Sequence, residues 1–156
     1  MAAAFSRTER YSRNLPRADG PLRPQRQADV RARRDRDRPG NALTEVLGEK
    51  SFDIVFMSQL VHHFTDEQSR TLMKKIARAL RPGGVCVMLD FIRPAKPGDG
   101  GQTAALRDLY FAMTSESGTW PVETLQDWLQ SSGLKPLKPV WMRNMPCAAL
   151  VTGRNP

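Results

Sequence analysis

The chain has 156 residues, of which 40% are hydrophobic, and a formal net charge of +8. This is enough for one domain with a single hydrophobic core. The charge is uneven: residues 1–40 contain eleven arginines and five acidic residues, a net charge of +6, so the other 116 residues carry only +2. The basic composition therefore says little about the part of the chain that can fold.

The two cysteines, Cys86 and Cys147, are 61 positions apart. This spacing matches neither a disulfide framework nor a set of metal ligands. No apolar run approaches the roughly 20 residues that a membrane-spanning helix needs. We therefore expect a cytoplasmic protein with no membrane contact and no metal site.

Residues 1–40 are rich in arginine and interrupted by prolines, and they show no amphipathic period. We predict that this segment is disordered and that residues 41–156 form the folded part. The charge run at residues 31–38 could attract a polyanion. Without interleaved aromatic residues, a solvated charge run explains it better, so a nucleic-acid partner is not favoured.

Two apolar runs, at residues 54–57 and 85–89, flank a helical pattern. Continuous apolar runs favour strands that are buried on both faces of a parallel sheet. Between them, residues 65–68 are typical of a capping box, and apolar residues then recur every three or four positions as far as Leu80. Pro82 and the two glycines after it end the helix. This order predicts a right-handed strand, helix, strand crossover.

The second half continues the alternation of helices and strands. Thr103 is predicted to cap a helix with one apolar stripe, most simply explained as core: Leu106, Leu109, Tyr110 and Met113. A second amphipathic helix starts near Pro121 and stops before Gly133. Residues 137–142 and 148–152 are predicted strands, joined by a turn at residues 144–146. Such alternation predicts an α/β layered sheet.

Three segments taken together resemble a known family: residues 52–64 (FDIVFMSQLVHHF), 77–84 (ARALRPGG) and 89–91 (LDF). They resemble the region from the fourth to the fifth strand of class I S-adenosylmethionine-dependent methyltransferases. Among these, they are most similar to the O-methyltransferase branch. The resemblance implies a Rossmann-like, mostly parallel sheet of seven strands, of which this chain supplies strands four to seven. It also implies S-adenosyl-L-methionine as cofactor and a small-molecule acceptor.

Methyl transfer from a sulfonium is an in-line displacement, so the protein must align donor and acceptor and remove the acceptor's proton. In the O-methyltransferase branch, a histidine matching His62 accepts this proton, and an acidic residue matching Asp90 orients that histidine. A neutral imidazole suits this role because its unperturbed pKa is about 6.5. His62 and His63 could instead shape a cofactor pocket, and Asp90 could simply hydrogen-bond a strand end.

The resemblance also implies two sets of binding residues. The cofactor set is Asn41, Ala42, Met57, Ser58, Gln59 and His63. The substrate set is Phe91, Tyr110, Met113 and Trp120, although core packing explains the last three equally well. Where related enzymes often carry a second acid, this chain has Thr119 or its neighbours.

Residues 1–40 contain only two glycines, Gly20 and Gly40, so the glycine-rich cofactor turn of the family is missing and the segment looks unrelated to the family. Loss of the family's first strand would leave residues 54–57 as an exposed apolar edge. We therefore expect an O-methyltransferase-like domain that is incomplete on its N-terminal side. It either methylates a small-molecule hydroxyl or is inactive because it is truncated. The alternative is a non-catalytic interaction module that uses the exposed edge, for example in self-association, together with the basic tail.

Overall fold

A computed structural model describes residues 4–6, 40–94, 96, 99 and 101–156. The predicted disorder of residues 1–40 falls largely outside the described residues. The chain order is β1 (Ala4–Ser6), β2 (Phe52–Ser58), the 3-10 turn η1 (Val61–His63), α2 (Asp66–Ala79), β3 (Leu80–Phe91), α3 (Gly101–Thr114), α4 (Val122–Ser131), β4 (Lys135–Pro136), β5 (Val140–Trp141) and β6 (Ala148–Arg154).

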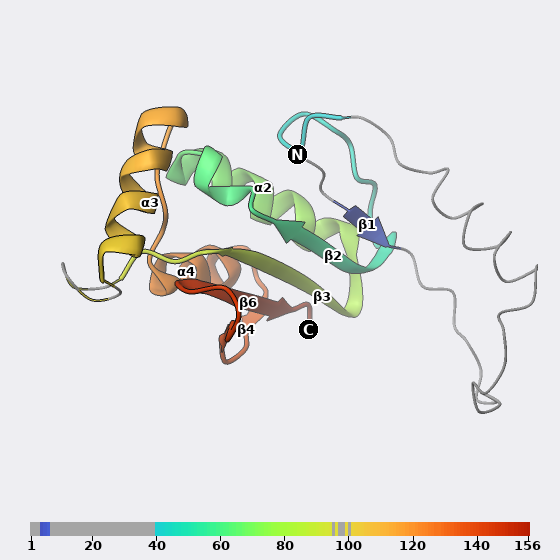
Figure 1. The fold of residues 1–156 in the computed structure, drawn as a ribbon. Helices are drawn as coiled ribbons and strands as arrows, with labels where there is room; N and C mark the ends of the chain where they lie inside the picture. The colour runs from blue at the N-terminus through green and yellow to red at the C-terminus, as the bar shows by residue number, and fades with distance from the viewer. Residues whose placement is uncertain (1–3, 7–39, 95, 97–98, 100) are drawn as a thin grey trace, which may run out of the picture.

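The strands form one mixed sheet in the order β1, β2, β3, β6, β4, with β5 also paired to β6. β2 and β3 are parallel, with Val55 opposite Cys86 and Met57 opposite Met88. β6 runs antiparallel to β3. Figure 1 shows that β2 and β3 both run toward the end of the sheet where α3 stands. The predicted α/β class and the parallel central pair are confirmed, and the carboxyl ends of both strands meet at one edge.

The helix between the parallel strands begins as its cap predicts. The Thr65 side chain accepts a hydrogen bond from the Gln68 backbone N–H, and the Gln68 side chain accepts one from the Thr65 N–H. The helix ends at Ala79, earlier than predicted, because Leu80 has extended backbone angles and pairs with Phe52 of β2. Sheet pairing starts here, two residues before Pro82, which disfavours helical geometry in the residue before it.

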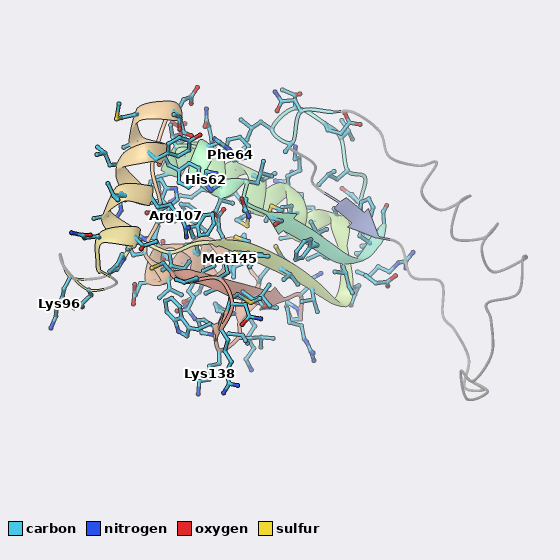
Figure 2. All side chains as sticks on the ribbon, viewed as in Figure 1. His62, Phe64, Lys96, Arg107, Lys138 and Met145 are labelled. Atoms are coloured by element: carbon cyan, nitrogen blue, oxygen red, sulfur yellow. The ribbon has the colours of Figure 1, made fainter. Side chains whose placement is uncertain are left out.

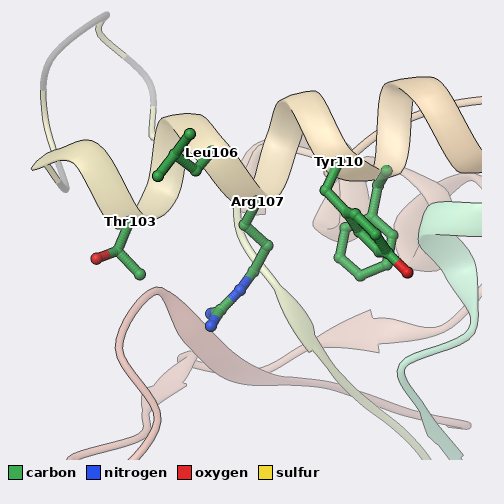
Figure 3. Close-up of a pocket in the computed structure, with 5 residues that line it drawn as sticks. Thr103, Leu106, Arg107 and Tyr110 are labelled. Atoms are coloured by element: carbon green, nitrogen blue, oxygen red, sulfur yellow. The ribbon is translucent and has the colours of Figure 1, made fainter.

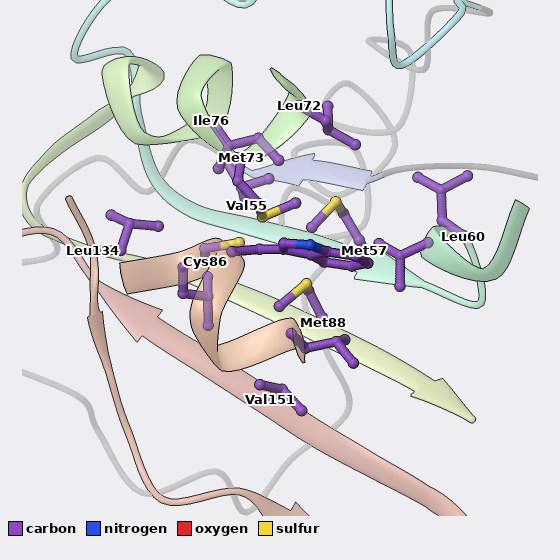
Figure 4. Close-up of a cluster of buried hydrophobic side chains, with 14 of the residues drawn as sticks. Val55, Met57, Leu60, Leu72, Met73, Ile76, Cys86, Met88, Leu134 and Val151 are labelled. Carbon is purple, nitrogen blue, oxygen red and sulfur yellow. The ribbon is translucent and has the colours of Figure 1, made fainter. Parts of the chain in front are cut away.

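One face of the sheet carries the hydrophobic core. Val55 and Met57 of β2 and Cys86 and Met88 of β3 are all at most 2% exposed, and they pack with residues from α2, α4 and β6 (Figure 4). The alternate residues are more open, with Ile54 40% exposed. The predicted burial on both faces is therefore wrong for the described residues, because α2 and α4 cover the same face, where their apolar residues Leu72, Ile76, Leu125 and Trp128 join one core cluster.

Helix α3 stands across the end of the sheet, apart from α2 and α4 (Figure 1). It begins at Gly101, so Thr103 lies inside the helix and does not cap it. The apolar stripe predicted as core is mostly solvent-exposed: Leu106 65%, Leu109 55%, Tyr110 60% and Met113 77%. The side chains that α3 buries are Ala104 and Phe111, on a different side of the helix.

The edge of β2 is occupied over three residues. β1 pairs antiparallel with β2, with Ala4 opposite Phe56 and Ser6 opposite Ile54. The prediction of a fully exposed edge at residues 54–57 is therefore wrong for residues 54–56. The backbone groups of β1 close part of the hydrogen-bond ladder that β2 would otherwise present to solvent.

The C-terminal part follows the prediction with smaller strands. Pro121 is the N-cap of α4, and Gly133 has the positive φ of 90° expected after a helix. Of the strand predicted at residues 137–142, only β5 forms, and the short strand β4 lies before the predicted range. The predicted turn lies between β5 and β6. In the described part of the chain, no helix is both long and apolar enough to cross a membrane.

Candidate active site

The site is built where β2 and β3 end. The chain leaves β2 through Gln59, which has a positive φ of 49°, and enters the 3-10 turn that carries His62. Asp90 is the second-last residue of β3. The His62 Nδ1 and Asp90 Oδ1 atoms are 2.6 Å apart, and the two residues are 0% and 3% exposed. The predicted catalytic pair is therefore in direct contact and buried.

The Asp90 carboxylate also fixes the backbone of the turn. Its Oδ2 accepts hydrogen bonds from the Leu60 and Val61 backbone N–H groups, both at 3.1 Å. Its Oδ1 accepts a bond from the Phe91 N–H at 2.8 Å. Since a carboxylate can only accept, the contact with His62 places a hydrogen on Nδ1, and in the neutral ring the lone pair is then on Nε2. Asp90 thus holds both the position and the tautomer of the ring.

The second nitrogen of His62 has no hydrogen-bond partner among the described residues, although it is buried. The ring of Phe111 lies against the imidazole, with 3.8 Å between ring centroids. A buried polar atom without a partner is costly, so each one needs a physical explanation. In a neutral His62 ring, Nε2 would carry the lone pair that a proton acceptor needs, under the edge of α3.

The ring of Phe111 lies close to the rings of several predicted site residues. The ring centroid of Phe91 lies 6.1 Å from that of Phe111, that of Tyr110 lies 5.3 Å away, and that of His63 lies 6.1 Å away. Phe111 itself was not predicted. Its only sequence signal is a seven-residue spacing from Ala104, which marks the buried side of α3.

Two predicted substrate residues lie apart from this cluster. Met113 is 77% exposed on the outer side of α3. Trp120 packs against Trp128 of α4, with 5.1 Å between ring centroids, and joins the edge of the core. Its indole nitrogen is, like the Ser69 hydroxyl oxygen and His62 Nε2, a buried atom without a hydrogen-bond partner in the described chain. Core packing thus accounts for the ring of Trp120.

His63 sits beside the pair and faces α3. Its Nδ1 lies 2.7 Å from the Ser115 hydroxyl oxygen. Burial lowers the pKa of His63 below its ordinary value of 6.5, and the neighbouring His62 lowers it further. His63 is therefore favoured in its neutral form, which can both donate and accept a hydrogen bond.

The predicted cofactor residues fall into two groups. Ser58, Gln59 and His63 lie at or after the carboxyl end of β2, whereas the side chain of Met57 is buried in the core. Asn41 and Ala42 lie in a turn held against α2, where the Lys75 ammonium donates a hydrogen bond to the Ala42 carbonyl oxygen. The first group shares an edge with His62 and Asp90.

The described residues contain no group of three or more histidine, cysteine, aspartate or glutamate side chains that could hold a metal ion.

Comparison with known proteins agrees with this architecture. A family described as "Methyltransferase domain" matches residues 22–88, so the match begins inside the segment that we predicted to be unrelated to the family. That prediction is too broad for residues 22–40. A search of curated proteins gives no match.

Solved structures show the same fold over most of the chain. The O-methyltransferase family 2 protein from Planctomyces limnophilus, in complex with apigenin, has a TM-score of 0.67 at 18% identity, with 84% of this chain covered. The mitomycin 7-O-methyltransferase MmcR has 0.68 at 16% identity and 85% coverage, and human N-acetylserotonin methyltransferase, in complex with SAM, has 0.61 at 16% identity and 76% coverage. The aligned part spans 38%, 38% and 33% of those chains, respectively.

The chain therefore has the fold of these methyltransferase structures, as the sequence predicted.

Proposed function

We propose that this chain carries the acceptor side of an O-methyltransferase active site, in which His62 removes the proton from a small-molecule hydroxyl. The observation that carries the proposal is the buried His62 imidazole, held at Nδ1 by Asp90 and left with a lone pair at Nε2. General bases of this kind contribute about 10²- to 10⁴-fold to rate.

The roles of the two residues differ. His62 would contact the acceptor hydroxyl directly. Asp90 is a positioning residue, because its four hydrogen bonds fix the turn and the tautomer without reaching the reacting atoms. As the hydroxyl proton moves to Nε2, the imidazole gains charge, and the adjacent carboxylate stabilises it.

S-adenosyl-L-methionine, when bound, would supply the electrophilic methyl group. The fitting residues are Ser58, Gln59 and His63, because they lie at the carboxyl end of a parallel strand, where class I methyltransferases and other open α/β folds bind ligands. The glycine-rich turn of the family is not found in residues 1–40. We therefore expect the cofactor to bind this chain weakly.

The acceptor would enter beside α3. Phe111 lies against His62, so its ring must shift for a hydroxyl to reach Nε2. The rings of Phe91 and Tyr110 lie around Phe111 and offer an aromatic wall to a small planar acceptor. A small-molecule acceptor is in keeping with the apigenin complex of a structural neighbour.

The test combines cofactor binding and methyl transfer on one set of proteins. Calorimetry with S-adenosylmethionine gives the affinity, and label transfer to a panel of hydroxylated aromatic compounds gives the rate at saturating cofactor. We expect His62→Gln to lower the rate by at least 100-fold while leaving cofactor affinity within threefold. His63→Gln is the matched neighbour, and it should weaken cofactor binding more than it lowers the saturated rate.

Two results would count against the proposal. One is a His62→Gln protein that transfers methyl groups as fast as the unaltered chain. The other is clear cofactor binding by the unaltered chain with no transfer to any hydroxyl compound in the panel.

A further inference from the structure

Arg107 extends from α3 over the aromatic ring of Phe91, with its guanidinium carbon 3.8 Å from the ring centroid. One of its nitrogens donates a hydrogen bond to the Pro146 carbonyl oxygen at 3.0 Å, in the turn between β5 and β6. Figure 3 shows the side chain reaching from α3 toward the strands below. Two contacts therefore hold the guanidinium in one place, and most of its N–H donors stay available.

The charge of Arg107 is not neutralised within the described chain. Arg70, Arg81 and Arg93 each form an ion pair with an aspartate, whereas no carboxylate among the described residues pairs with Arg107. Its sequence neighbour Asp108 is already bound to Arg93, to the Thr119 backbone N–H and to the Thr119 hydroxyl. A fixed, half-buried guanidinium without a counter-ion is suited to bind an anion.

This guanidinium lines an open groove of about 400 Å³ together with Thr103, Leu106, Tyr110 and Phe111. Leu106 and Tyr110 give the groove an apolar, aromatic side (Figure 3). Phe111 lines the groove and also lies against His62, so its ring separates the groove from the proposed base. Figure 2 shows His62 and Arg107 at the same end of the sheet, beside α3.

We propose that this groove binds the carboxylate of a planar aromatic acceptor, and that Arg107 determines specificity for acceptors carrying that charge. This inference rests on the proposed function, because it takes the bound molecule to be the methyl acceptor. It adds the chemical class of that acceptor. Guanidinium and carboxylate form two parallel hydrogen bonds, a geometry that a lysine cannot reproduce. The ring of the acceptor would then lie against Tyr110 and Phe111 with its hydroxyl toward His62.

The test is a direct titration without cofactor, followed by nuclear magnetic resonance, with two probes that share a ring. The probes are 3,4-dihydroxybenzoate and 1,2-dihydroxybenzene, which lacks the carboxylate. We expect the unaltered chain to bind the first at least tenfold more tightly. Arg107→Met should remove this preference, Arg107→Lys should keep only part of it, and the matched control Arg154→Met, at the far end of β6, should leave it unchanged.

Equal affinity for the two probes, binding of neither, or an unchanged preference in Arg107→Met would overturn the inference. A structural role alone would change the thermal stability of Arg107→Met but not the ratio of the two affinities. If the preference is found and methyl transfer is not, only the proposed function fails. If transfer is found without the preference, only this inference fails.

Discussion

Replacing Asp90 with asparagine tests whether one buried carboxylate holds the site together. Four donors converge on it: the Leu60, Val61 and Phe91 backbone N–H groups and the His62 Nδ1. The amide oxygen of asparagine can accept from two donors, and its NH₂ group would face the other two. Two buried donors would therefore lose their acceptor.

Each buried donor left without a partner costs about 1–3 kcal/mol, so two of them cost about 2–6 kcal/mol. A domain of this size is typically stable by about 5–15 kcal/mol, so the loss is a large fraction of the total. The imidazole would also lose the acceptor that fixes its tautomer. We therefore expect Asp90→Asn both to destabilise the fold and to disturb the ring.

The assay is urea unfolding followed by circular dichroism, together with ¹⁵N resonances of the His62 ring, which report the tautomer. Asp127→Asn is the control, because Asp127 forms an ion pair with Arg70 but its side chain is 58% exposed. An exposed pair contributes about 0–1 kcal/mol. If Asp90→Asn is no less stable than the control and the tautomer is unchanged, Asp90 does not organise the site.

Three further predictions concern the cap, a histidine and the cysteines. Thr65→Ala should lower the free energy of unfolding by about 1 kcal/mol because it removes the capping box, while Thr65→Ser should retain most of it; equal urea midpoints for the two would contradict this. Because burial lowers the pKa of His63, this residue binds a proton more readily in the unfolded chain than in the folded chain. The contribution of His63 to stability is therefore complete above pH 6.5 and is lost as the pH falls toward the pKa of the folded state. Urea titrations between pH 5 and pH 8 should thus show a smaller loss at low pH in His63→Asn, and an identical pH profile would refute the assignment. Burial raises the pKa of the Cys86 thiol to about 12, so a thiol reagent at about pH 8 should modify Cys147 alone in the folded chain and both cysteines in guanidinium; modification of Cys86 in the folded chain would contradict its burial.

The central crossover could be predicted because its signals are local. The cap at Thr65, the helical period after it and the glycine at position 83, with a φ of 78°, all lie within a few residues of the features they determine. The burial of the strands could not be predicted in the same way. An apolar run indicates that both faces can be buried, but which helices supply the cover depends on tertiary packing.

The pairing of His62 with Asp90 was predicted from the family resemblance and from the shared edge of parallel strands. The residues are 28 positions apart, and periodicity gives no information about such a contact. The sequence raised the alternative that Asp90 hydrogen-bonds a strand end, but it did not identify the three backbone donors. Two of them, the Leu60 and Val61 N–H groups, depend on the path that the chain takes after Gln59, whose positive φ no residue type specifies in advance.

Helix α3 shows why the apolar period selected the wrong side. Its docked side carries Ala104, Asp108 and Phe111, at spacings of four and three residues, and Asp108 binds Arg93 and Thr119. Because the charged Asp108 lies in the middle of the docked side, that side looks polar in the sequence. The outer stripe therefore looks more apolar than the side that packs. Besides the contacts of Arg107, the helix is held by the ring of Phe111 and the carboxylate of Asp108. An acid thus reaches Thr119 from another element of the fold.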